Sequence, residues 1–118
     1  MKTTILALLG LALSLPAYAA DPDTITVYSA RKEHLIKPLF DAYTEQTGVQ
    51  IRYITDKAGP LLARLKAEGA NTPADMLMTV DAGNLWQAAE SGVLSPVESE
   101  ALNQNIPAHL RDPGNQWF

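Results

Sequence analysis

The strongest constraint on the fold is an alternation of strand-like and helix-like segments along the chain. Strand patterns, either alternating or continuously apolar and rich in β-branched residues, occur at residues 24–28, 49–54 and 76–80. Each is followed by a segment with apolar residues at helical spacing. This order predicts an α/β fold with a mostly parallel sheet and helices on both faces. Because residues 76–80 are apolar on both sides, they are predicted to form the central, buried strand.

The helix boundaries follow from prolines, glycines and capping residues. The apolar spacing predicts a helix over residues 33–47, which Gly48 would end. Pro38 is unfavourable inside a helix, so we expect a later start that leaves part of residues 31–34 as a loop. Pro60 is predicted at the first position of a second helix, which ends at residues 68–69.

Two further helices are predicted in the second half of the chain. Asp81 or Asn84 could cap a helix that ends near residues 91–92, with Leu85 and Trp86 in the core. Ser95 and Glu98 match a capping box, which predicts a helix over residues 96–105. Residues 106–118 are expected to be mostly loop.

The amino terminus has the layout of a secretory signal peptide. Lys2 precedes an apolar run over residues 5–15, and Ala17-Tyr18-Ala19 forms a small-residue cleavage site. We therefore predict a signal peptide at residues 1–19, cleaved after Ala19 or Ala20. The apolar run is shorter than the roughly 20 residues that span a bilayer, so the exported protein is not expected to be inserted in a membrane.

Composition narrows the function classes. The formal net charge is −4 and no basic face is visible, which argues against a nucleic-acid partner. The chain has no cysteine, which excludes disulfides and thiolate metal sites. No nucleophile motif or phosphate-binding glycine loop is present, so we predict that the protein is not an enzyme.

In parallel sheets, ligands bind beyond the carboxyl ends of the strands. This places candidate residues in the loops at 29–34, 55–59 and 79–84. Arg31, with Ser29 beside it, is the favoured contact for an oxyanion, because its planar guanidinium binds such groups in bidentate fashion. Asp81 could contact a ligand or cap a helix. His34 is a weak metal-ligand candidate, because it has no histidine or cysteine partner at close spacing.

Four short segments carry a resemblance to a known family. They are Val-Tyr-Ser-Ala-Arg at 27–31, Thr-Asp-Lys-Ala-Gly at 55–59, Asn-Thr-Pro-Ala-Asp at 71–75 and Thr-Val-Asp-Ala-Gly-Asn-Leu-Trp at 79–86. They resemble the amino-terminal part of periplasmic ferric-iron-binding proteins, the substrate-binding components of iron(III) ABC transporters. The last segment is the most specific.

The resemblance implies a periplasmic protein with two transferrin-like α/β lobes that close around ferric iron and a synergistic anion such as carbonate. Its partners would be an ABC permease and ATPase, and it would act as a monomer. Arg31 would contact the anion. Lys32 and Glu33 stand where some members have a ligating histidine, or histidine and then tyrosine.

The resemblance also implies that residues 20–118 are an incomplete amino-terminal lobe. The paired tyrosines that hold iron in the family lie in a later part, so iron is expected only in the full-length protein. Tyr28, Tyr43 and Tyr53 are instead expected to be strand and core residues. The last residues, Trp117 and Phe118, begin a new apolar element, which agrees with truncation.

Two alternatives stay open at this stage. The chain could be part of a solute-binding protein for another ligand, an oxyanion or a polyamine. It could also be a complete small exported α/β domain of unknown activity.

Overall fold

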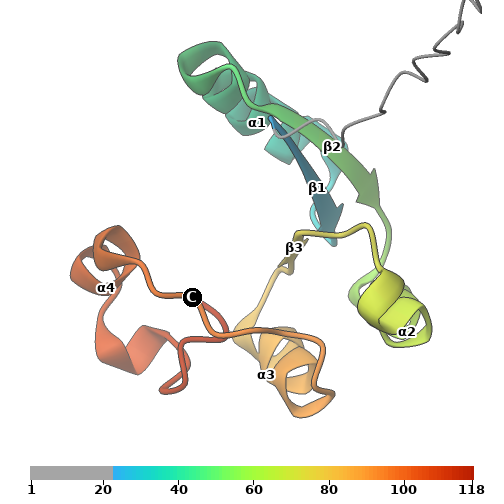
Figure 1. Ribbon diagram of the computed structural model, residues 1–118, viewed down its shortest axis with the longest axis vertical. Helices are drawn as coiled ribbons and strands as arrows, with labels where there is room; N and C mark the ends of the chain where they lie inside the picture. The colour runs from blue at the N-terminus through green and yellow to red at the C-terminus, as the bar shows by residue number, and fades with distance from the viewer. Residues whose placement is uncertain (1–22) are drawn as a thin grey trace, which may run out of the picture.

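A parallel three-stranded sheet forms the centre of the fold. The computed structural model describes residues 23–118, so the predicted signal peptide lies outside the described residues. Strand β1 (Thr24–Ser29) lies between β2 (Gln50–Thr55) and β3 (Met76–Met78) (Figure 1). The register pairs Val27 with Tyr53 on one side and with Met76 on the other. The predicted parallel α/β fold is therefore confirmed.

Helices connect the strands and continue beyond the sheet. Helix α1 (Glu33–Thr47) joins β1 to β2, and α2 (Ala58–Glu68) leads, through a 3₁₀ turn at Gly69–Asn71, to β3. After β3 come α3 (Ala82–Glu90), α4 (Glu100–Asn105) and a 3₁₀ turn at Ala108–Leu110. Among the described residues, no helix combines the length and apolar character needed to cross a membrane.

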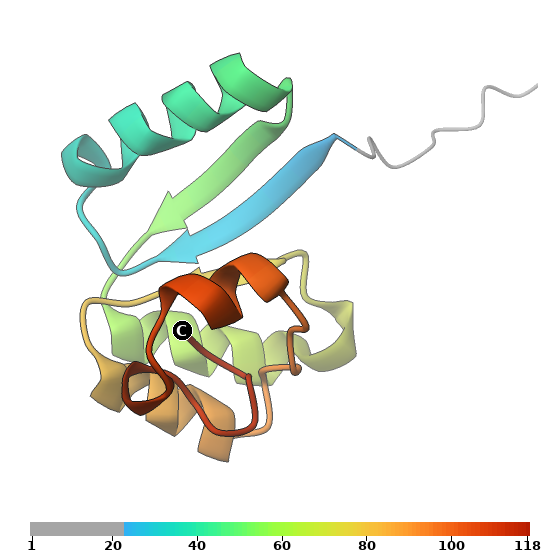
Figure 2. The ribbon, with the colours of Figure 1, turned by 90° about the vertical axis from the view of Figure 1, so that its left-hand side faces the viewer.

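Both faces of the sheet are covered, one by α1 and the other by α2 (Figure 2). Successive side chains of a strand point to opposite faces. Val27 accordingly packs with Ile36 and Phe40 of α1. Its neighbour Tyr28 packs on the other side, in a buried cluster with two leucines of α2, Leu61 and Leu65. The predicted placement of helices on both faces is confirmed.

The prediction that residues 76–80 form the central strand is wrong. β1 is central, and β3 ends at Met78 on the edge of the described sheet, where Met76 is 49% exposed. The segment is apolar on both sides because each face of the sheet has its own cluster. Met78 packs against the cluster under α1, and Leu77 packs against the cluster under α2.

The predicted late start of the first helix is also wrong, because α1 begins at Glu33 and contains Pro38. The first turn is tightened by a hydrogen bond from Leu35 N–H to the carbonyl of Lys32 (3.0 Å). Proline cannot donate a backbone bond inside a helix, but Pro38 lies on the exposed side of α1. Ile36 and Phe40 on either side of it are buried and hold the helix on the sheet.

Two other helix starts differ from prediction. Pro60 is the third residue of α2 rather than the first, because the helix begins at Ala58. The last helix begins at Glu100 rather than at residue 96, because Ser99 caps it by accepting a hydrogen bond from Leu102 N–H (3.3 Å). The expected capping box of Ser95 and Glu98 is therefore not formed.

The expected core positions of two aromatic residues are not observed either. Trp86 is 57% exposed on α3, and Tyr43 is 42% exposed on α1. Tyr53 is partly buried as expected, with its ring 5.5 Å from that of Phe40. Helical spacing could not distinguish the side of α1 that meets the sheet from the neighbouring apolar side that carries Tyr43.

Candidate functional site

The carboxyl ends of the three strands meet at one edge of the sheet. Ser29 is in register with Thr55 of β2 and Met78 of β3. Two backbone bonds continue this pairing: Ala30 N–H donates to the Met78 carbonyl (2.8 Å), and Asp56 N–H donates to the Ser29 carbonyl (3.2 Å). The loops after the strands, which carry the predicted site residues, therefore leave the sheet together.

Ser29 shapes the loop after β1. Its side chain is fully buried, and its hydroxyl accepts a hydrogen bond from Arg31 N–H (3.0 Å). The same hydroxyl lies 3.3 Å from the Arg31 carbonyl, to which it donates. The Ser29 hydroxyl is thus engaged with the backbone that carries Arg31, while the side chain of Arg31 is exposed to solvent.

Charged side chains lie where the first two helices begin. Lys32 is the N-cap residue of α1 and Lys57 is that of α2, and neither side chain caps its helix. With Arg31, they add three cationic side chains to helix ends that carry partial positive charge. Asp56 directly precedes Lys57, and its carboxylate accepts a hydrogen bond from Lys57 N–H (2.7 Å). Glu33 in the first turn of α1 and Asp81 before α3 add further carboxylates, so this end of the sheet carries charges of both signs beside the backbone donors of the helix starts.

Asp81 caps α3, so the capping role that the sequence left open is the one observed. Its Oδ1 accepts a hydrogen bond from Asn84 N–H (2.8 Å). The Asn84 side-chain amide lies 3.1 Å from Oδ1 and 3.0 Å from Oδ2. Thr79 donates its hydroxyl to the Asp81 carbonyl (2.8 Å), which fixes the turn before the helix. The carboxylate remains solvent exposed despite these contacts.

His34 lies exposed in the first turn of α1. The other histidine, His109, is exposed in the 3₁₀ turn at Ala108–Leu110. Within residues 23–118, histidine and acidic side chains form no group of three or more that could hold a metal ion.

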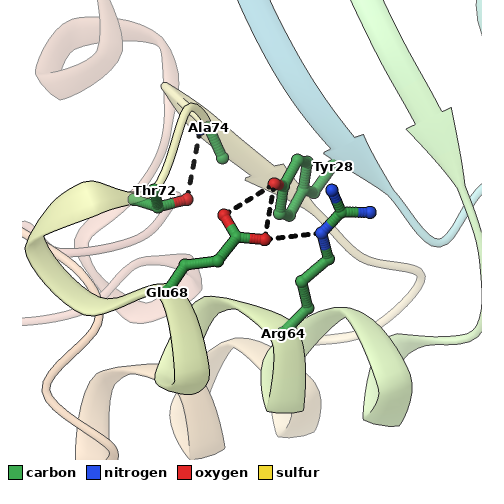
Figure 3. Close-up of polar contacts among 5 residues, drawn as sticks. All are labelled: Tyr28, Arg64, Glu68, Thr72 and Ala74. Carbon is green, nitrogen blue, oxygen red and sulfur yellow. Dashed lines mark hydrogen bonds and ion pairs between the residues drawn. The ribbon is translucent and has the colours of Figure 1, made fainter.

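Sequence reasoning missed a polar cluster beneath the sheet, formed by Tyr28, Arg64 and Glu68 (Figure 3). The Tyr28 hydroxyl lies 2.9 Å from each carboxylate oxygen of Glu68. Arg64 donates its Nε–H to the same carboxylate, and its guanidinium carbon lies 5.1 Å from the centre of the Tyr28 ring. The i, i+4 spacing of Arg64 and Glu68 was the available signal, but it does not show that a strand tyrosine joins them.

The cluster changes the acidity of its members. Burial raises the pKa of Glu68, but hydrogen bonds from Arg64, Tyr28 and Thr72 outweigh this effect and leave the pKa below its ordinary value. The hydrogen bond to Glu68 raises the pKa of Arg64. Glu68 is therefore a carboxylate at neutral pH. It links α2 to β1 through its hydrogen bond with Tyr28, the residue before Ser29.

A hollow of about 510 Å³ lies near the carboxyl-terminal ends of α2 and α3. Its lining includes Leu65, Lys66, Gly69, Thr72, Gly92 and Val93. Arg31, Ser29 and Asp81 are not part of it. The hollow therefore does not coincide with the predicted site.

Comparison with known proteins places this arrangement in context. No protein-family model matches the chain. Iron uptake protein A1 of Synechocystis sp. is 46% identical over 94 residues, which are 80% of this chain and 26% of that protein. A Trichodesmium protein solved with iron and citrate ligands has a TM-score of 0.77 and 47% identity, covering 80% of this chain and 30% of that one.

A ferric binding protein from Campylobacter jejuni also has a TM-score of 0.77, at 41% identity. The match covers 80% of this chain and 30% of the Campylobacter jejuni protein. The resemblance to ferric-iron-binding proteins is confirmed. The chain spans less than a third of the length of these relatives. The parallel sheet with its two helical layers is the fold of a segment of these transferrin-like proteins.

Proposed function

We propose that the chain forms part of a periplasmic, non-catalytic receptor that captures ferric iron together with a synergistic anion. The observation that carries this proposal is the similarity to proteins named for iron uptake and ferric binding, together with the exposed Arg31 just beyond the carboxyl end of β1. An ABC permease and ATPase would receive the iron. The signal peptide proposed at residues 1–19 would direct the protein to the periplasm.

In this proposal, residues 20–118 contribute one wall of the cleft. Fe(III) is a hard cation that prefers oxygen ligands, and a carbonate or citrate anion can complete its coordination. Arg31 would bind such an anion, and this role is supported by its exposed side chain and by the bond from its backbone N–H to the buried Ser29. The iron ligands themselves would come from another segment of the complete protein.

The roles of the other predicted residues divide accordingly. Ser29 would act by positioning Arg31, since its hydroxyl already bonds to the Arg31 backbone. Asp81 would fix the loop after β3 by capping α3, with its exposed carboxylate at the edge of the cleft. His34 would take no part in the site unless another segment supplied further ligands beside it.

A spectroscopic titration tests the proposed function. The product of the complete reading frame that contains this sequence would be titrated with ferric ion in the presence of bicarbonate or citrate. We expect a visible tyrosinate-to-iron charge-transfer band that saturates at one iron per protein. A product that binds another oxyanion or a polyamine and stays colourless with ferric ion would overturn the iron proposal in favour of the alternative ligand.

The segment described here supplies the matched control. Residues 20–118 lack the proposed ligand tyrosines of the second cleft wall, so we expect them to bind ferric ion more weakly than the micromolar range. Micromolar or tighter binding by this segment would contradict the division of the site between two parts of the protein.

A further inference from the structure

We draw no further inference here: the strongest candidate, the exposed apolar face of α1 that Leu35, Leu39 and Tyr43 form beside a hollow of about 350 Å³, is an unpartnered surface, and nothing in the described part of the chain shows what covers it.

Discussion

The hydroxyl of Tyr28 lies 2.9 Å from both carboxylate oxygens of Glu68, forty residues further along the chain. This contact joins the central strand to the last turn of α2. Ser29, the next residue of the strand, holds the backbone of Arg31. The contact between Tyr28 and Glu68 is therefore adjacent in the chain to Ser29, which holds the loop that carries the proposed anion contact.

Replacing Tyr28 with phenylalanine should lower the free energy of unfolding by about 1 kcal/mol, because a partly buried hydrogen bond to a carboxylate is lost. Urea unfolding would measure the change. Tyr43→Phe is the matched control, since Tyr43 is 42% exposed on α1 and should tolerate the change. Equal stability of the two variants would show that the Tyr28 contact contributes nothing measurable.

Glu68 should make the stability of the protein depend on pH in the acid range. Its pKa in the folded state lies below the ordinary value of 4.5, so folding favours the carboxylate. The resulting stabilisation is complete above pH 4.5 and is lost as the pH falls through the lower folded pKa. We expect the stability difference between the wild type and Glu68→Gln to shrink below pH 4.5, as measured by urea unfolding at several pH values. A difference that stays constant across this range would contradict the assignment.

A buried leucine and an exposed leucine allow a direct comparison of stability. Leu61 is 1% exposed in the cluster with Tyr28, whereas Leu39 is 62% exposed on α1. Leu61→Ala should cost about 2–5 kcal/mol through lost burial and the cavity left behind. Leu39→Ala should change stability by less than about 0.5 kcal/mol. Denaturant unfolding would compare them, and a larger loss for Leu39→Ala would mean that its face of α1 is buried in the protein as it exists.

Asp81 should stabilise the start of α3. Asp81→Ala is expected to lower the free energy of unfolding by about 1 kcal/mol, because the N–H of Asn84 loses its side-chain partner. Asp81→Asn keeps an oxygen at the same position and should retain most of the stability. If both variants were equally destabilised, the carboxylate charge rather than the cap would be responsible.

The sequence predicted the elements better than their positions in the sheet. Alternating strand and helix patterns were sufficient for the parallel fold, since each helix must return the chain to the end of the sheet at which every strand begins. They could not place β1 at the centre. Both faces of the sheet are covered, so Met76–Met78 is apolar on both sides although it is the outer strand, as a central strand would also be. Strand order depends on contacts between distant segments, which periodicity does not record.

The geometry of the candidate site was predictable to a similar degree. The grouping of the three loops followed from topology, and the capping role of Asp81 was one of two stated possibilities. The bond between the Ser29 hydroxyl and the Arg31 backbone required the geometry of the turn. The link between Tyr28 and Glu68 required knowledge of which face of α2 meets the sheet.

The most direct test of the account concerns Arg31. In the product of the complete reading frame, ferric affinity would be measured by competition titration at increasing bicarbonate concentration, for the wild type, Arg31→Gln and Arg52→Gln. Arg52 is an exposed arginine within β2, so its replacement keeps the net charge matched without altering the carboxyl edge. We predict that Arg31→Gln weakens iron binding by about 10- to 100-fold and reduces its dependence on bicarbonate, while Arg52→Gln leaves both unchanged. Wild-type affinity and bicarbonate dependence in Arg31→Gln would contradict the proposed anion contact.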